Sequence, residues 1–218
     1  MLELFGHPFS SYTWKAQIAL YEKGLPFTFR MVDPDHPDNR AELSRHWSLV
    51  KFPVLVDDGR PVIESSIIIE YLDLRYPDSI RLLPQDAMAA LDMRFIDRLF
   101  DNHVMGPVQA IVTEHLFHAE SPDQQRLDRA QATLAAIYAW LDTRLGQGEW
   151  ACGADFTMAD CAAAPALFYA DWVRPIDPTL ERLAAYRARL LARPSVARCV
   201  EDARPFRHFF PPGAPDRD

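Results

Sequence analysis

Short apolar runs separated by one helical pattern dominate the first third of the chain. Residues 2–5 alternate apolar and polar side chains as a short strand does, and residues 27–32 repeat the alternation. Between them, residues 11–23 carry apolar side chains at helical spacing, and Gly24 follows as a typical helix stop. Strand, helix and strand in this order predict a βαβ unit with a right-handed crossover.

A second set of elements follows the βαβ unit. Residues 33–50 predict a loop with a short, irregular helix. Residues 54–56 and 61–63 predict an antiparallel hairpin, and residues 65–75 predict a helix. The order β-α-β, α, β-β-α resembles a thioredoxin-like α/β domain, which we expect to span residues 1–78.

From residue 87 onward the pattern is helical, and residues 87–210 predict an all-α domain, a helical bundle. Residues 127–145 repeat apolar side chains at three- and four-residue steps, and we expect this helix to close at Gly146 and Gly148. The aromatic run Phe206–Phe210 is expected to fold back over the domain, which would bury its three phenylalanines.

One helix start is marked clearly by its sequence. Thr157 can cap the backbone, and Asp160, three residues on, can reach back to it as in a capping box. The following residues 161–169 are almost wholly apolar, which is typical of a helix inside a domain. We therefore interpret this box as folding chemistry rather than catalysis.

Composition and charge limit the classes of partner that we expect for this protein and the cellular compartment in which we expect it. The chain has 218 residues, 49% of them hydrophobic, and a formal net charge of -8. Because no basic patch is available to displace counterions from phosphates, we expect no nucleic-acid binding. No apolar run approaches the roughly 18 residues of a membrane span, and the N-terminus lacks secretory features, so we expect a cytoplasmic protein without a membrane partner. Cys152, Cys161 and Cys199 form no CxxC pair and are expected to be reduced.

Three segments carry candidate chemistry. The turn Phe9–Tyr12 places hydroxyls at a helix start, where they can stabilise an anion or merely cap the helix. The segment Lys51–Leu55 begins an apolar strand after a proline, so its backbone can dock an extended peptide. Glu64 and Ser65 stand where the next helix begins, a place that binds carboxylates. Together they outline a glutathione site.

With these segments and the Phe-Thr-x-x-Asp box in order, residues 1–205 resemble a cytosolic glutathione transferase of a bacterial serine type, theta- or zeta-like. The resemblance implies a homodimer, glutathione as co-substrate in the N-terminal domain, and a pocket for a small hydrophobic electrophile shared with the helical domain. It also implies conjugation of the glutathione thiolate to that electrophile.

The resemblance assigns roles to single residues. Ser10 corresponds to the serine whose hydroxyl stabilises the thiolate, with Ser11 as the alternative, because family members often carry Pro where this chain has Ser11. Pro53 corresponds to a cis proline that exposes the backbone of Phe52, and Lys51 would meet the glycine carboxylate. Of the pair at the next helix start, Ser65 would hold the γ-glutamyl carboxylate and Glu64 the γ-glutamyl ammonium. Each of these residues also has a purely structural interpretation, as a helix cap, as a proline that starts a strand or as a solvated surface charge.

The sequence indicates the electrophile pocket less clearly than the glutathione site, because aromatic and Met side chains at helical spacing are often core residues. By position in similar folds, the candidates are Phe9, Tyr12, His103, Met105, Phe168 and Trp172. Glu114, His115 and His118 lack a further matched ligand, so no metal site is expected.

Two other functions stay open. The run Ser10–Trp14 resembles that of maleylacetoacetate isomerases, although Tyr12 stands where those have cysteine, so a glutathione-dependent isomerase is one alternative. The other is a non-catalytic interaction module, because fold does not fix function.

Overall fold

The computed structural model of the protein describes residues 1–145 and 148–218. Gly146, where we expected a helix to close, lies outside the described residues. The N-terminal part contains a four-stranded sheet in the order β2-β1-β3-β4, in which β1 and β2 are parallel and the other pairs are antiparallel. Its strands are β1 (Leu2–Gly6), β2 (Phe27–Met31), β3 (Val54–Asp57) and β4 (Arg60–Ile63).

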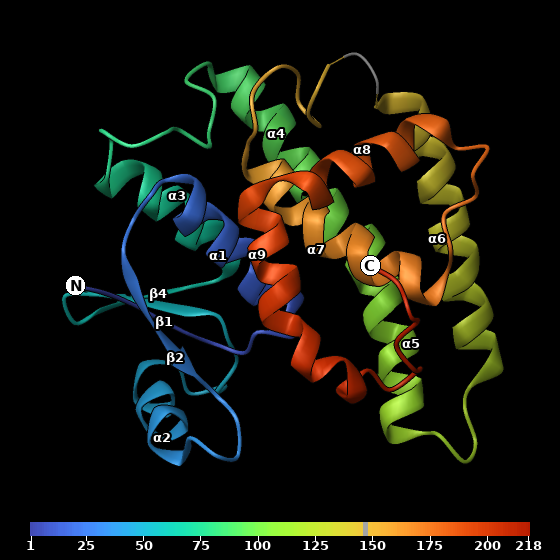
Figure 1. The fold of residues 1–218 in the computed structure, drawn as a ribbon, viewed down its shortest axis with the longest axis horizontal. Coiled ribbons are helices and arrows are strands. Elements are labelled where there is room, and N and C mark those ends of the chain that lie inside the picture. The colour runs from blue at the N-terminus through green and yellow to red at the C-terminus, as the bar shows by residue number, and fades with distance from the viewer. Residues whose placement is uncertain (146–147) are drawn as a thin grey trace.

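Helices cover both faces of this sheet, as Figure 1 shows. They are α1 (Ser11–Glu22), α2 (Pro37–His46) and α3 (Ser65–Arg75). Successive strand residues point to opposite faces, so Leu4 joins the core formed with α1 and α3, whereas Phe5 packs with Leu43 of α2. The arrangement confirms the predicted thioredoxin-like α/β fold.

The prediction for α2 was wrong in one respect. We expected a short, irregular helix, but the structure has a regular helix of ten residues. Pro37 at its first turn, Asp38 beside it and Arg45 in the last turn all favour a helix. Only Leu43 of this helix is buried, and one buried position gives no hydrophobic periodicity to detect.

The remainder of the described chain is helical and confirms the predicted all-α part. Its elements are α4 (Ala87–Leu99), the π-helical η1 (Phe100–Met105), α5 (Gly106–Phe117), α6 (Gln124–Arg144), α7 (Met158–Val173), α8 (Glu181–Ala192), α9 (Pro194–Ala203) and the 3-10 helix η2 (Arg204–Phe209). Helix α7 runs through the centre of this part and packs against α1, while α9 packs against α1 and α8 (Figure 1). Within residues 1–145 and 148–218, no helix combines the length and apolar content needed to cross a bilayer.

The capping box at the start of α7 is confirmed. Asp160 is fully buried and accepts hydrogen bonds from the Thr157 backbone N–H at 2.8 Å and the Ala151 N–H at 2.9 Å. The Tyr186 hydroxyl donates to the same carboxylate at 2.6 Å. Burial raises the pKa of Asp160 despite these donors. The box therefore joins α7, α8 and the preceding loop.

The aromatic tail is only partly buried, contrary to our expectation. Phe210 is 6% exposed and packs on the helical core, but Phe209 is 58% exposed. In a 3-10 helix, side chains three residues apart lie on one side, and Phe206 and Phe209 accordingly stack on each other. This geometry turns one phenylalanine inward and leaves the others nearer the surface.

Candidate functional site

A cavity of about 280 Å³ lies between the loop before β3, the start of α3 and the π-helical segment η1. Its wall includes the five residues that the sequence analysis predicted to bind glutathione: Lys51, Phe52, Pro53, Glu64 and Ser65. The other wall residues are Tyr12, Trp47, Ile63, Arg98, Asp101 and Asn102. The fold therefore brings together the two segments that we predicted to bind glutathione, and adds a wall from the helical part that the sequence analysis missed.

The loop before β3 has the backbone form that the resemblance implied. The Phe52–Pro53 peptide bond is cis. Pro53 is buried and Phe52 half-buried, whereas Lys51 is exposed at the cavity rim. An exposed ammonium at a rim acts as a point charge toward an anion.

The start of α3 carries no side-chain cap among the described residues. Glu64 adopts φ 73° and ψ 122°, a left-handed conformation that costs a non-glycine residue about 1–3 kcal/mol. The Glu64 carbonyl accepts the Ile68 N–H at 2.8 Å. Ser65, the first helical residue, is 6% exposed. First-turn N–H groups without acceptors, together with the helix dipole, favour a carboxylate here.

The serine turn is held by its own hydrogen bonds. Ser10 is the N-cap of α1, and its Oγ accepts the Thr13 backbone N–H at 3.3 Å. Its N–H donates to the His7 carbonyl at 3.0 Å. A hydroxyl has one donor and two acceptor positions, so capping leaves the Ser10 O–H available to donate. Ser11 is only 6% exposed, whereas Ser10 is half-buried.

Behind the cavity lies a buried ionic cluster that the sequence analysis did not identify. The Lys15 ammonium, 1% exposed, is 2.6 Å from Asp97 Oδ1, 2.7 Å from Asp101 Oδ2 and 2.8 Å from Ser66 Oγ. Arg98 also pairs with both carboxylates, at 2.8 Å and 2.6 Å. The cluster joins α1 and α3 to α4 and η1. The acidic and basic residues within the otherwise apolar stretch 87–105 were the signal for it.

The cluster sets the electrostatics of the cavity wall. Burial raises the pKa of Asp101, while Lys15 opposes the rise. Burial, reinforced by the Asp101 charge, raises the pKa of Tyr12 to about 12. The Tyr12 phenol is therefore protonated at neutral pH and can donate a hydrogen bond into the cavity.

Of the six predicted electrophile-pocket residues, Tyr12 alone lines the cavity described above. Met105 and Phe168 are 3% and 1% exposed and belong to the core, so here they are packing residues. Phe9 and Trp172 have ring centroids 6.2 Å apart within an aromatic cluster that includes Phe210. His103 is exposed on η1, and Tyr12 lines the cavity between the loop before β3 and the start of α3. Close packing of α7 against α1 is the physical reason for this burial.

Glu114, weighed above as a metal ligand, has a different partner. Its carboxylate accepts from Arg126 at 3.0 Å and from the Asp123 N–H at 3.1 Å. In the part of the chain that the structure describes, no group of three or more His, Cys, Asp and Glu residues is arranged to hold a metal ion.

Comparison with known proteins identifies the family. The family model described as "Glutathione S-transferase, N-terminal domain" matches residues 4–79, and "Glutathione S-transferase, C-terminal domain" matches residues 124–189. A solved glutathione S-transferase from Methylobacterium radiotolerans, in complex with glutathione sulfonate, is 32% identical. The alignment covers 91% of this chain and 94% of that one, with a TM-score of 0.78.

Curated relatives are more varied in their names. A stringent starvation protein A homolog of Coxiella burnetii is 30% identical over 77% of this chain and 75% of its own length. A probable maleylacetoacetate isomerase of Caenorhabditis elegans is 28% identical over 77% of this chain and 78% of its own length. The chain belongs to the glutathione S-transferase family. These relatives identify the family rather than a subtype within it.

Proposed function

We propose that this protein binds glutathione in the cavity between the loop before β3 and the start of α3, and conjugates it to small hydrophobic electrophiles. The observation that carries the proposal is the convergence of Lys51, Phe52, Pro53, Glu64 and Ser65 on one cavity wall. In the reaction, the glutathione sulfur forms a bond to an electrophilic carbon, and the displaced group leaves with its electron pair or the adduct takes up a proton.

Each end of glutathione has a complementary group in this cavity. The uncapped start of α3 with Ser65 suits the γ-glutamyl carboxylate, and the exposed Glu64 carboxylate suits the ammonium. The Phe52 backbone pairs with the cysteinyl segment as an added strand does. Lys51 at the rim then meets the glycine carboxylate.

The proposed thiolate donor is Ser10, with Ser11 as the alternative. Its O–H is left free by the capping arrangement, and α1 begins one residue later, so both the hydrogen bond and the helix dipole favour an anionic sulfur. Lowering the thiol pKa by about two units from its usual 8.5 requires only about 2.7 kcal/mol of preferential stabilisation. Such an amount is within the reach of one charge-assisted hydrogen bond and a helix terminus.

The decisive experiment is glutathione titration by calorimetry, combined with ultraviolet thiolate absorbance against pH. We expect binding, and a bound thiol that ionises at lower pH than free glutathione. The Ser65→Ala variant should weaken binding, whereas Ser121→Ala, an exposed serine far from the cavity in the sequence, should not. Absence of binding at millimolar glutathione would show that the proposal is wrong.

We further propose a homodimer located in the cytoplasm. Five large hydrophobic side chains on α3 and α4 are each more than half exposed. Single exposed hydrophobic residues are normal on a protein surface, but a group of them indicates an interaction surface. They are Ile67, Leu74, Met88, Leu91 and Phe95. Sedimentation of the protein and of Phe95→Glu tests this: the variant should dissociate, and a monomeric parent protein would refute the dimer.

A glutathione-dependent isomerase is the second candidate. It is favoured by the likeness to the probable maleylacetoacetate isomerase and by the serines of the turn before α1. Tyr12 on the cavity wall, in place of that family's cysteine, distinguishes the two candidates. Turnover of maleylacetone without conjugation of any aryl halide, epoxide or enone would favour the isomerase.

A further inference from the structure

The segment between β1 and the serine turn contains a histidine whose side chain bonds to the backbone of the residues that follow it. His7 comes directly after β1. The Phe9 backbone N–H donates to His7 Nδ1 at 3.1 Å, and the Ser10 N–H donates to the His7 carbonyl oxygen at 3.0 Å. Because Pro8 has no N–H, every backbone N–H between His7 and the start of α1 is bonded to His7.

Other contacts hold the carbonyl groups of the same segment. The Tyr169 hydroxyl donates to the Phe9 carbonyl at 2.9 Å, and the Trp14 indole N–H donates to the Pro8 carbonyl at 2.5 Å. Both of these partners are donors, so neither can serve the Phe9 N–H, which needs an acceptor. A partly buried N–H without an acceptor is unfavourable, so we expect the segment to rearrange when Nδ1 is removed.

The hydrogen bond to Nδ1 requires a neutral imidazole. A ring nitrogen accepts a hydrogen bond only when it carries no proton, so the proton of His7 must lie on Nε2. Burial lowers the pKa of His7, and the charge of Asp33 opposes this fall. The Asp33 carboxylate has His36 as its own partner, at 2.6 Å. Nδ1 of His7 is therefore an acceptor at neutral pH.

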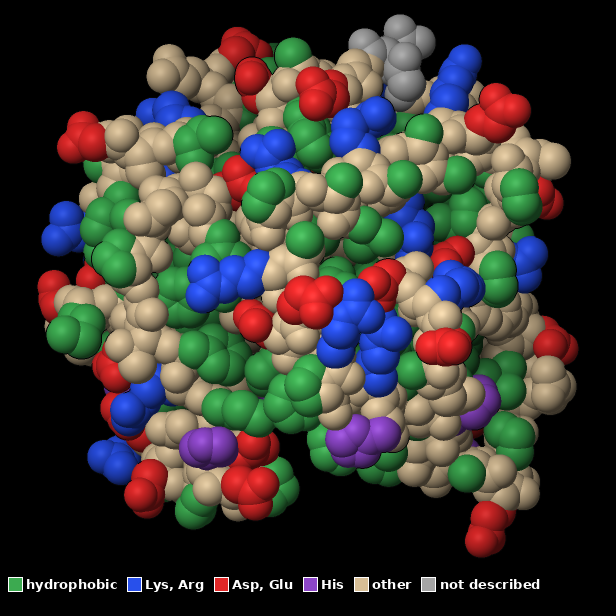
Figure 2. Space-filling view, in the orientation of Figure 1, with side chains coloured by type: hydrophobic (Ala, Val, Ile, Leu, Met, Phe, Trp, Pro, Cys, Tyr) green, Lys and Arg blue, Asp and Glu red, His purple; other side chains and the backbone are tan. Residues whose placement is uncertain are grey.

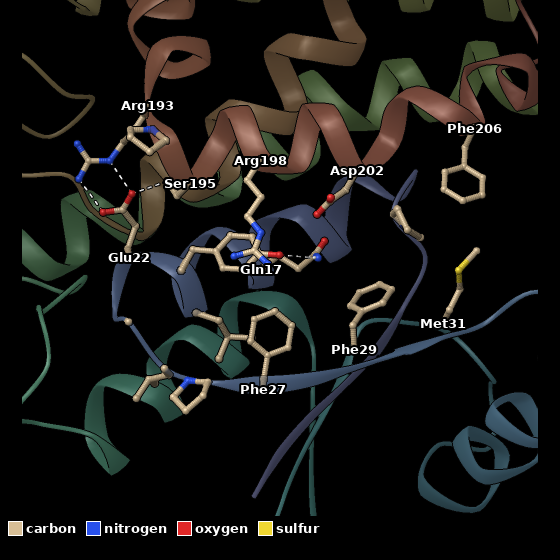
Figure 3. Close-up of a pocket in the computed structure, with 17 residues that line it drawn as sticks. Gln17, Glu22, Phe27, Phe29, Met31, Arg193, Ser195, Arg198, Asp202 and Phe206 are labelled. Carbon is tan, nitrogen blue, oxygen red and sulfur yellow. Dashed lines mark hydrogen bonds and ion pairs between the residues drawn. The ribbon is translucent and has the colours of Figure 1, made fainter.

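An aromatic contact on the other side of the ring helps to orient the imidazole. A groove of about 1190 Å³ lies between β2 and α9, and Phe206 of η2 lines one end of it (Figure 3). Figure 2 shows hydrophobic side chains gathered where the sheet edge meets α9. The His7 ring meets the Phe206 ring edge-on, with centroids 4.8 Å apart. This contact and the Phe9 N–H together hold the ring in one orientation.

The position of the Ser10 hydroxyl depends on the backbone that His7 holds. Ser10 Oγ accepts the Thr13 N–H at 3.3 Å, and its own O–H is left to donate. The direction of that O–H follows from where the Ser10 Cα and Cβ lie. A displacement of about 1 Å at a reacting group can lower a rate about 100-fold, so small changes in this backbone matter.

We propose that His7 is a positioning residue for the glutathione thiolate: its neutral imidazole fixes the backbone before Ser10 and so aims the Ser10 hydroxyl at the glutathione sulfur. The inference rests on the proposed function, with Ser10 as the thiolate donor, and adds a residue that does not line the glutathione cavity. His7 acts through Ser10 and does not itself touch glutathione.

Two substitutions separate the acceptor from the ring. His7→Phe keeps a ring against Phe206 and removes the acceptor. His7→Asn loses the ring but keeps an acceptor, because an Asn side chain bonds to the backbone two residues on in an Asx turn. The matched control is His118→Phe, at an exposed histidine that follows α5.

The thiolate absorbance of bound glutathione and the rate with chlorodinitrobenzene are measured against pH. In His7→Phe the pKa of the bound thiol should rise by about one unit from about 6.5, and kcat at pH 7 should fall about threefold. KM for glutathione should change less than about twofold, because Lys51, Glu64 and Ser65 remain. The kcat deficit should vanish above about pH 9, where the thiol is ionised in either protein, whereas a general structural defect would persist. His7→Asn and His118→Phe should behave as the parent protein does.

Amide hydrogen exchange at Phe9 gives a readout without glutathione. The Phe9 N–H should exchange about tenfold faster in His7→Phe than in the parent, and equal exchange would overturn the proposal. An equal thiol pKa in His7→Phe and the parent would overturn it and leave the transferase proposal intact, whereas a parent that does not bind glutathione would overturn both. If His7→Phe does not fold, His7→Asn decides alone: a raised thiol pKa in that variant would contradict the role of the acceptor, and an unchanged one would support it.

Discussion

Replacing Lys15 with Met tests the buried ionic cluster most directly. The Lys15 ammonium is 1% exposed and lies within 2.8 Å of Asp97, Asp101 and Ser66. Met retains much of the aliphatic stem but donates no hydrogen bond. The variant therefore leaves two buried carboxylates with Arg98 as their remaining cation in the cluster.

The expected loss of stability follows from the removal of the Lys15 ammonium from the cluster. Removing one partner of a buried ion pair costs about 3–5 kcal/mol, because the other charge stays buried. Arg98 still pairs with both carboxylates, so we expect the lower end of this range, about 3 kcal/mol of unfolding free energy. A domain stability of about 5–15 kcal/mol leaves the variant folded and measurable.

Urea unfolding at several pH values is the assay. Burial holds the pKa of Asp101 above its ordinary 3.8, and Lys15 opposes the rise, so the Lys15→Met variant raises it further. A raised pKa means that the folded state binds protons more tightly than the unfolded state, so stability is lost as pH rises through the folded pKa. The variant's deficit should thus be full at neutral pH and shrink as pH falls toward 3.8.

The matched control is Lys51→Met, at an exposed lysine, which should change stability by no more than about 0.5 kcal/mol. A Lys15→Met deficit below about 1 kcal/mol, with the same pH dependence as the parent, would refute the reasoning. It would show that Arg98 alone neutralises the cluster.

Three further predictions concern single side chains. Ser10→Ala should lower turnover at pH 7 about 25-fold, because the pKa of the bound glutathione thiol would return from near 6.5 to about 8.5 and most of the thiolate would be lost. Ser10→Thr keeps the hydroxyl and should keep most activity. Equal rates for the two variants would exclude Ser10 as the thiolate donor. Asp160→Ala should destabilise the protein by about 3 kcal/mol in thermal unfolding, because it leaves the Tyr186 hydroxyl and buried N–H groups unpaired; an unchanged melting temperature would contradict this. Gly6→Ala should cost about 1–3 kcal/mol in urea unfolding, since its Cβ would lie 2.5 Å from Thr13 Cγ2; a cost near zero would mean that Thr13 moves freely aside.

Interactions between residues close together in the chain made several structural features of this protein predictable from its sequence. The capping box at Thr157 and Asp160, the hairpin before α3 and the helix start at Ser65 each rest on neighbours within a few residues. The cis Phe52–Pro53 bond followed from a family resemblance rather than from local preference. The glutathione-binding roles of these residues remain predictions.

The tertiary structure decided how side chains from distant segments meet. Lys15 is a charged residue within a helical pattern, and nothing near it in sequence shows that Asp97 and Asp101 bury it. The groove between β2 and α9 likewise depends on chain segments more than 150 residues apart, with Gln17 and Arg198 both reaching Tyr21. Propensity and periodicity depend on neighbours along the chain, whereas burial and ion pairing depend on how distant elements pack. The sequence by itself thus determined the elements and their order, and packing alone determined which charges are buried and which cavities are open.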